Sequence, residues 1–586
     1  MNKEELRAKF TDIHGNDQEQ LDFILSEENR LIVTAPAGCG KTKAMISKIA
    51  HEIITNDYLN NKRILALTFS VNAAAKIRED IKETLPILLG KANYEVDDKL
   101  DVSNYHGFAN RILRKHGYIL HDNFKNINDF IMISENSGEL RKVLVSQEIR
   151  VLEDYDESLK KIDFKEADRL QGSYIDIVLT KLVPRNIITY NGILLLAMQI
   201  LEKKAIRDFY KLYYQMVIVD EFQDTNYLAL QFLMRIIEAN KVILMGDDIQ
   251  KIYGFLGAVP NIFKKMENQY NMLPMEFRTN YRFKDNKNMK QLDSYIRGIF
   301  RNYNNISSYS KTANINFKLF KSDNGEARFI YKDLLKYTTA DKKVAILFRA
   351  KYLASDLINI LEKNKIMYFN GLFEDSDPEY IKFHKEALEI FINESGVRKS
   401  ISRTVITSVK GKLNAKKQTI TNNETMFNSL MRLLDALLDT TKAKNISTEE
   451  KYEAIIFTLN NNSLKRLMNE INEQVTLTTI HSSKGLEWDY VYLPHMTSYS
   501  FPTSKSLCKL CSKNNGRSLY EKHCKFDFVS GLEEPFYEEL SVLYVALTRA
   551  KQDVFLTASR GPNQFGYNKK VNCFLTLPKL KIINNF

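Results

Sequence analysis

Two short segments contain residue types that suit nucleotide chemistry. The first is a glycine-rich stretch, Ala35-Pro-Ala-Gly-Cys-Gly-Lys-Thr42. Glycines let backbone N–H groups approach phosphate oxygens, Lys41 can reach the β- and γ-phosphates, and the Thr42 hydroxyl can hold Mg²⁺. The strict pattern has Gly at the position of Ala35, and such strings also arise by chance in loops. A second motif is therefore needed.

That second motif is Val217-Ile-Val-Asp-Glu221. Its apolar residues predict a buried strand with two carboxylates at the C-terminal end. Asp220 is expected to bind Mg²⁺ and Glu221 to polarise the attacking water. A solvated acidic turn is the alternative for an isolated Asp-Glu pair, but the buried strand and the upstream glycine-rich loop favour catalysis. Together the two motifs predict an NTPase that uses Mg²⁺ with its nucleotide.

The elements around these motifs alternate between strands and helices, which predicts an α/β fold with parallel sheets flanked by helices. Two such α/β domains are expected, each interrupted by a helical insertion. The first domain covers 1–104 and 206–276, with an insertion at 105–205 that shows no clean strands. The second domain covers 277–375 and 471–586, with an insertion at 376–470.

Composition is that of a multidomain globular protein. The 586 residues are 44% hydrophobic and 27% charged, and no apolar run approaches the ~20 residues that span a bilayer. The N-terminus carries acidic residues and no apolar stretch, so we expect a cytoplasmic protein without a membrane partner. Five cysteines in so long a chain argue against a disulfide scaffold.

The charge balance is basic, because 84 Lys and Arg residues exceed 72 Asp and Glu residues and give a net charge of +12. A basic surface attracts polyanions, of which nucleic acid is the commonest. A lysine-rich surface that reflects a biased genome is the alternative. Charge alone therefore does not decide between these interpretations.

A series of motifs resembles those of the UvrD/Rep/PcrA group of superfamily 1 DNA helicases, in the family's order from about residue 16 to 557. The matching segments are Leu67–Ala75, Tyr105–Phe108, Asp220–Thr225, Gly246–Ala258, Asn280–Arg282, Thr479–Trp488 and Glu539–Lys551, together with the glycine-rich loop and Gln20 upstream of it. The resemblance implies two tandem RecA-like P-loop domains. It also implies an ATP-dependent enzyme that moves 3′→5′ on single-stranded DNA and unwinds duplex.

The resemblance further implies roles in the ATP site. Gln20 would recognise the adenine edge, Tyr281 would stack on its face and Glu487 would contact the ribose. Ala35, Pro36, Ala37, Gly38, Cys39, Gly40, Lys41, Thr42 and Lys43 would complete this site. Gln250 would sense the γ-phosphate. Arg282 and Arg549 would act as arginine fingers from the second domain, because planar guanidinium groups neutralise charge on the transferring phosphoryl oxygens. The expected catalytic set is thus Glu221, Asp220, Gln250, Arg282 and Arg549.

The DNA contacts implied by the resemblance come from Thr68, Phe69, Tyr105, His106, Phe108, Tyr253, Phe255 and His481. Aromatic faces stack on bases for ~1–3 kcal/mol each without sequence preference, which suits a motor that steps over any sequence. Local packing is the usual role of an aromatic residue in a loop. Single-stranded and forked DNA are the expected partners.

Another group of residues suggests a metal. Cys508, Cys511, His523 and Cys524 lie in a lysine-rich stretch and offer the ligand types that tetrahedral Zn²⁺ takes. A solvated Cys-rich loop is the alternative, because adjacent His523 and Cys524 cannot easily both point at one ion.

Competing functions remain open at this point. The second insertion is short for the family, and the chain ends soon after the last motif, leaving no room for a nuclease domain. The chain could instead be a DNA-stimulated ATPase subunit that regulates a partner nuclease or other subunit, for example in anti-phage defence. An RNA helicase is a third hypothesis. DNA repair, replication and defence are all compatible with the motifs.

Overall fold

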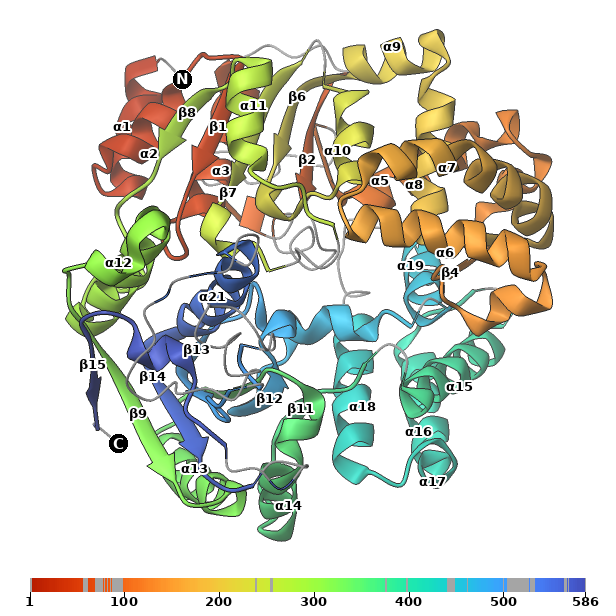
Figure 1. Ribbon diagram of the computed structural model, residues 1–586. Helices are drawn as coiled ribbons and strands as arrows, with labels where there is room; N and C mark the ends of the chain where they lie inside the picture. Colours follow the sequence, from red (N-terminus) through yellow and green to blue (C-terminus); the bar gives the residue numbers. More distant parts are fainter. Residues whose placement is uncertain are drawn as a thin grey trace. The chain divides into compact units, whose positions relative to one another are not determined.

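The computed structural model shown in Figure 1 describes residues 3–584 except 56–61, 69–76, 78–79, 82, 85, 87–98, 238–239, 253–256, 375–376, 397–398, 440–447, 461, 499, 503–525, 527, 529–532, 563–565 and 567–568. The chain forms two compact units, Met1–Arg282 and Phe283–Phe586. Each unit is described by itself.

The first unit contains a six-stranded parallel sheet with the strand order β3-β2-β6-β7-β1-β8. Its strands are β1 (Arg30–Thr34), β2 (Arg63–Thr68), β3 (Leu100–Asn104), β6 (Tyr214–Val219), β7 (Lys241–Gly246) and β8 (Leu273–Glu276). The helices outside its insertion are α1 (Lys3–His14), α2 (Gln18–Leu25), α3 (Lys41–Thr55), α10 (Tyr227–Met234) and α11 (Ile262–Tyr270).

Both faces of this sheet are buried, as the continuous apolar runs of its strands require. In β1, Leu31 and Val33 pack in a core with α1, α2 and α3, whereas Ile32 packs on the other face in a core that includes α10 and α11. Successive side chains of a strand point to opposite faces, so a strand covered on both sides must be apolar throughout. Figure 1 shows α3 and α11 on opposite faces of the sheet.

A helical insertion lies between β3 and β6. Its helices are α5 (Tyr105–His116), α6 (Ser146–Lys160), α7 (Phe164–Ile177), α8 (Tyr190–Leu201) and α9 (Lys204–Tyr213). The insertion also contains a two-stranded parallel sheet of β4 (Ile131–Ile133) and β5 (Ile187–Thr189), which differs from the expected absence of strands. These strands have three residues each, too short for a two-residue periodicity to stand out in the sequence.

The second unit contains a seven-stranded parallel sheet with the order β11-β12-β10-β13-β14-β9-β15. Its strands are β9 (Ala313–Phe320), β10 (Val344–Phe348), β11 (Phe369–Gly371), β12 (Val475–Thr479), β13 (Trp488–Leu493), β14 (Ala550–Ser559) and β15 (Leu580–Ile583). The helices that accompany this sheet are α12 (Lys287–Arg301), α13 (Asp323–Thr338), α14 (Ser355–Lys363) and α21 (Glu533–Leu547).

The helical segment between β11 and β12 has its own apolar core. Its helices are α15 (Pro378–Ser395), α16 (Arg403–Ala415), α17 (Lys417–Ile420), α18 (Glu424–Asp439) and α19 (Thr448–Asn460). Phe383, Phe427 and Leu430 lie at the centre of this core and are fully buried.

The predicted fold class, two parallel sheets flanked by helices, is confirmed by the two sheets and the helices that accompany them. Within the described residues, no helix is both long enough and apolar enough to cross a bilayer.

Truncating the centre of the first sheet should destabilise its unit. Ile218 in β6 is fully buried, so Ile218→Ala removes three carbon atoms and leaves a cavity that costs about 2–5 kcal/mol. Chemical denaturation followed by circular dichroism measures this loss. Ile392→Ala on α15 is the control, because that side chain is 45% exposed and its truncation should cost about 0.5 kcal/mol or less. Equal losses in the two variants would contradict the assigned core.

Candidate functional site

The glycine-rich loop connects β1 to α3 and adopts a conformation that only glycine accepts at two positions. Gly38 and Gly40 have φ values of +82° and +71°. A Cβ atom on Gly38 would lie 2.6 Å from the Arg282 Cβ, and one on Gly40 would lie 2.8 Å from the Gln20 amide nitrogen. The loop therefore keeps its backbone open to a ligand through both dihedral freedom and the absence of side chains.

Lys41, the first residue of α3, makes an ion pair with both carboxylates at the end of β6. Its Nζ lies 3.0 Å from Asp220 Oδ1 and 2.6 Å from Glu221 Oε1. Burial by itself lowers the pKa of Lys41, but the charges of Asp220 and Glu221 outweigh it and hold the pKa well above its usual value. Burial raises the pKa of Asp220 against the opposing effect of Lys41. The Lys41 ammonium group is therefore charged, and it balances the negative charge of the Asp220 carboxylate, which is buried from solvent.

Glu221 stands at the turn after β6 with φ +53°. Positive φ is uncommon for residues other than glycine, and such strain concentrates at functional sites. Its second carboxylate oxygen, Oε2, accepts a hydrogen bond from the side-chain amide of Gln223. Gln223 Oε1 in turn accepts the backbone N–H of Asp247 at 3.0 Å, and Asp247 Oδ2 accepts Gln250 Nε2 at 2.8 Å. A continuous polar path thus runs from Glu221 to Gln250.

Gly246 is required where this path crosses the end of β7. A Cβ atom at this position would lie 2.1 Å from Gln223 Oε1, well inside van der Waals contact. The same residue accepts the backbone N–H of Ala35 through its carbonyl at 2.8 Å, which ties the start of the glycine-rich loop to β7. The end of β7 is therefore shared by the loop and the polar path.

Gln20 lies beneath the loop in a buried network. Its Nε2 donates to the Cys39 carbonyl at 2.9 Å, and its Oε1 contacts His14 Nδ1. Because that amide oxygen only accepts, His14 Nδ1 carries the proton and Nε2 accepts the hydroxyl of Ser47 at 2.8 Å. Burial lowers the pKa of His14, which keeps the ring neutral as this arrangement needs. Gln20 is 1% exposed, so its amide is held against the loop.

The segment 280–282 packs against the outside of the loop. Asn280 Nδ2 donates to the Ala37 carbonyl at 3.0 Å, the Tyr281 N–H donates to the Gly38 carbonyl at 2.8 Å, and the Tyr281 hydroxyl donates to Asp17 at 2.6 Å. The Tyr281 ring is 42% exposed. The division between the units falls after Arg282, so Arg282 lies in the first unit, whereas the expected boundary after residue 276 places it in the second domain. The hydrogen bonds of Asn280 and Tyr281 to the glycine-rich loop explain why residues 280–282 belong to the first unit.

Four residues expected to contact DNA are described in the first unit. Thr68 is fully buried, and Tyr105 is 3% exposed with its hydroxyl 3.2 Å from Thr225 Oγ1. Phe108 is 1% exposed and lies edge-on to Tyr214 at 5.6 Å between ring centroids. Both aromatic rings pack inside the first unit and leave no ring face open, whereas both residues were expected to contact DNA. His106 is half-buried against Tyr190.

The remaining expected residues belong to the second unit or lie outside the described part of the chain. Arg549 is 4% exposed and donates to the carbonyls of Val545 and Leu486 at 3.0 and 3.2 Å. Glu487 is exposed, with Lys551 3.6 Å away. Burial and the charge of Arg349 lower the pKa of His481 to about 4, so this imidazole is neutral near pH 7. Phe69, Tyr253, Phe255, Cys508, Cys511, His523 and Cys524 lie outside the described residues.

The donor set of the first unit fits Mg²⁺. Asp220 at the end of β6 and Thr42 in the first turn of α3 are oxygen donors, which this hard cation prefers. Asp220 is buried and its negative charge is balanced by Lys41. These residues match a nucleotide-bound Mg²⁺, which takes one or two protein oxygens together with phosphate oxygens and water.

Several residues for which no individual role was expected also contribute to this site. They are His14, Asp17, Ser47, Gln223, Gly246 and Asn280. Gln223, Gly246 and Asn280 stood inside recognised motifs, so their positions carried a signal. His14 and Ser47 lie in α1 and α3 outside every recognised motif. Their role in positioning Gln20 becomes evident only from the hydrogen bonds that join them in the folded structure.

A glycine-rich loop between β1 and a helix, with paired carboxylates at the end of β6 two strands away in the same parallel sheet, is the arrangement of a P-loop ATPase. Comparison with known proteins agrees. Residues 16–271 match the UvrD/REP helicase N-terminal domain and residues 378–561 match the UvrD-like helicase C-terminal domain. The two matches cover most of the chain, and this protein belongs to the UvrD-like family of ATP-dependent DNA helicases.

Individual relatives align over nearly the whole chain. The "Probable DNA helicase II homolog" of Rickettsia conorii is 24% identical over 93% of this chain and 92% of its own. DNA helicase II of Rickettsia typhi is 25% identical over 93% and 92%. The ATP-dependent DNA helicase PcrA of Bacillus subtilis is 20% identical over 94% of this chain and 84% of its own.

The packing of Phe108 generates a prediction that separates a core role from a DNA contact. Phe108→Ala should destabilise the first unit by about 3–5 kcal/mol, because it empties a site enclosed by aromatic rings. Phe108→Leu keeps most of the volume and should leave single-stranded DNA affinity unchanged, as measured by fluorescence anisotropy. Tyr118→Ala, at a 54% exposed position, is the control for stability. A large loss of DNA affinity in a stably folded Phe108→Leu variant would restore the stacking role.

Proposed function

We propose that this helicase moves 3′→5′ along single-stranded DNA and unwinds duplex DNA through ATP hydrolysis at the site of its first unit. The observation that supports the hydrolytic site is the placement of Lys41 between Asp220 and Glu221 at the base of the glycine-rich loop. The direction of movement rests on the family resemblance alone, whereas the names DNA helicase II and PcrA of two relatives support helicase activity on DNA.

The glycine-rich loop would bind the phosphates of ATP through the backbone N–H groups of residues 35–42 and the N-terminus of α3. Lys41 would exchange its carboxylate partners for the β- and γ-phosphates, since its ammonium group is already charged and directed to the end of β6. Thr42 and Asp220 would hold Mg²⁺, which neutralises charge on the phosphate oxygens. Glu221 would then be released to orient a water molecule and take its proton.

Gln250 would report the state of the γ-phosphate to the DNA-binding part of the protein. The support is the hydrogen-bonded path from Glu221 through Gln223 and Asp247. A change in the charge balance at Glu221 would shift the Gln223 side-chain amide, which donates to Glu221. The shift would move Asp247 as well, because the Asp247 N–H donates to the other end of the same amide. Gln20 and Tyr281, both bonded next to the loop, would recognise adenine by its edge and its face, and Lys43 would border the same base.

The remaining roles enter the proposal through the family resemblance. Arg549, together with Arg282, would neutralise charge on the transferring phosphoryl group, and Glu487 would contact the ribose. His106 and His481 would contact DNA, the latter as a neutral hydrogen-bonding group rather than a cation. Phe69, Tyr253 and Phe255 would supply the stacking faces.

Removing the general base should stop turnover without preventing nucleotide binding. Glu221→Gln keeps the shape of the side chain but cannot accept a proton, so kcat for ATP should fall about 10²–10⁴-fold while a fluorescent ATP analogue still binds. Lys41→Ala should lose both binding and turnover. Glu139→Gln, an exposed residue paired with Lys142, is the matched control. Near-normal hydrolysis by Glu221→Gln would refute the assignment of the base.

The direction and the outcome of movement are tested with purified protein on tailed duplexes. We expect single-stranded DNA to stimulate ATP hydrolysis, and strand separation only where the duplex has a 3′ tail. Unwinding of the 5′-tailed duplex alone would overturn the polarity. Stimulated hydrolysis without unwinding of either duplex would overturn the helicase proposal in favour of a subunit that regulates a partner.

A further inference from the structure

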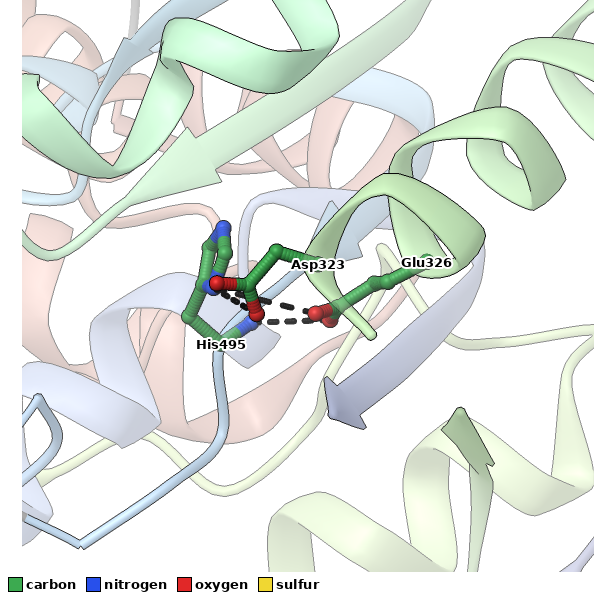
Figure 2. A group of neighbouring side chains, drawn as sticks. All are labelled: Asp323, Glu326 and His495. Atoms are coloured by element: carbon green, nitrogen blue, oxygen red, sulfur yellow. Dashed lines mark hydrogen bonds and ion pairs between the residues drawn. The ribbon is translucent and has the colours of Figure 1, made fainter. Parts of the chain in front are cut away.

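A cluster of potential metal ligands lies in the second unit, away from every motif that the nucleotide and DNA functions use. Asp323 and Glu326 occupy the first turn of α13, and His495 follows the end of β13. One ligand atom from each of the three lies within 4.8 Å of the other two. Figure 2 shows the three side chains directed toward one another.

Two atoms of this cluster are buried without a hydrogen bond. They are Glu326 Oε2 and His495 Nδ1, on side chains whose residues are 1% and 8% exposed. They lie 3.7 Å apart, beyond hydrogen-bonding distance. An unsatisfied buried polar atom costs about 1–3 kcal/mol, so a ligand that bonds to both atoms would remove this cost.

The rest of the cluster holds these two atoms in place. Glu326 Oε1 accepts the backbone N–H of His495 at 3.0 Å and the hydroxyl of Thr557 at 2.5 Å. The carboxylate is therefore fixed by one oxygen and directs the other at the imidazole. His495 has φ +57°, a backbone conformation that is uncommon for residues other than glycine. Strain of this kind is typical of a residue kept for its side chain rather than for its backbone.

We propose that Asp323, Glu326 and His495 bind a divalent transition-metal ion. Ligand atoms about 2.0–2.2 Å from a tetrahedral ion lie about 3.4 Å from one another. The observed separations of His495 Nδ1 from Glu326 Oε2 and Asp323 Oδ1 are 3.7 and 3.9 Å, so small side-chain rotations would close the site. The imidazole ligand favours ions of the zinc class over Mg²⁺ or Ca²⁺, which prefer oxygen.

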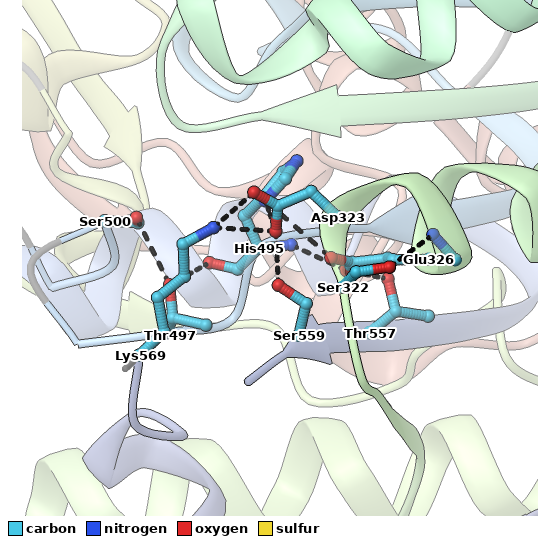
Figure 3. A network of polar contacts seen from close by, with 10 residues as sticks. Ser322, Asp323, Glu326, His495, Thr497, Ser500, Thr557, Ser559 and Lys569 are labelled. Carbon is cyan, nitrogen blue, oxygen red and sulfur yellow. Dashed lines mark hydrogen bonds and ion pairs between the residues drawn. The ribbon is translucent and has the colours of Figure 1, made fainter. Parts of the chain in front are cut away.

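Lys569 is the group that competes with this ion. Its ammonium lies 2.6 and 2.5 Å from the two carboxylate oxygens of Asp323, and Ser559 donates to the same carboxylate. Figure 3 shows Lys569 approaching Asp323 within this network. The bound ion would share Asp323 with Lys569 or displace it. Lys569 therefore tunes the affinity of the site by repulsion between like charges.

The bound ion would join two segments of the second unit that are distant in sequence. Asp323 and Glu326 lie in the first turn of α13, and His495 follows β13. Such an ion acts as a structural crosslink, because it binds the folded arrangement and not the unfolded chain. The inference does not depend on the proposed direction or mechanism of the helicase.

The test uses the full-length, nucleotide-free protein after treatment with a chelator and desalting. Calorimetric titration with Zn²⁺ should show a site that is weakened at least about tenfold in both Glu326→Gln and His495→Asn, since loss of even an outer partner costs that much. Glu326→Gln keeps Oε1 for its two donors, and Asn tolerates positive φ. Both variants should therefore fold. Glu139→Gln and His121→Asn are the matched controls and should bind as the wild type does.

A second zinc candidate in the same chain, Cys508 with Cys511, must be separated from this site. The titration is therefore repeated with the Cys508→Ser, Cys511→Ser double variant, in which the site at Glu326 should remain. Co²⁺ gives an independent signature: binding in the double variant should produce ligand-field bands without a thiolate-to-cobalt charge-transfer band. Absence of any Zn²⁺ or Co²⁺ binding by this double variant would overturn the proposal.

Lys569→Ala gives a readout that a purely structural role of the cluster would not produce. Removing the competing ammonium should tighten Zn²⁺ binding about tenfold and increase the rise in melting temperature that Zn²⁺ produces. Lys570→Ala, next in sequence, is the matched control. Unchanged or weakened Zn²⁺ binding by a folded Lys569→Ala variant would count against the site, as would wild-type binding by Glu326→Gln and His495→Asn.

Discussion

The ion pair between Lys41 and the carboxylates of Asp220 and Glu221 is the interaction on which the catalytic unit depends. Buried charges are costly unless they are paired, and this pair joins the first residue of α3 to the end of β6. The parallel sheet places these groups together, because the carboxyl ends of β1 and β6 lie at the same edge with only β7 between them. A phosphate group that attracts Lys41 therefore changes the electrostatic balance of the whole edge.

That change has a defined route through the first unit. Gln223 is fully buried and bonds both Glu221 and the backbone of Asp247, and the absence of a side chain on Gly246 makes room for it. A buried amide with both ends occupied cannot adjust at one end alone. The buried apolar residues of β6 and β7 flank this path, so its polar groups have few other partners within the core.

The second unit uses polar residues differently. Arg549 is 4% exposed, and its guanidinium donates to the backbone carbonyls of Val545 and Leu486 in its own unit. Elsewhere in the second unit, at the start of α13 and after β13, Glu326 and His495 each have a buried polar atom without a hydrogen bond. The first arrangement stabilises a charge by neutral dipoles, whereas the second leaves a cost that ligand binding would remove. Only the second suggests an additional ligand.

Local patterns in the sequence determined the fold class and indicated the candidate ATP site. Continuous apolar runs predicted strands buried on both faces, and the Gly-Lys-Thr and Asp-Glu segments predicted the groups now found within 3.0 Å of each other. Tertiary structure alone decided the rest. Phe108 lies in a recognised motif but is buried by Tyr210, Tyr214 and Phe232, and Glu326 meets His495 across 169 residues. Burial and long-range pairing depend on how the whole chain packs, because no local pattern specifies which distant side chains close over a residue.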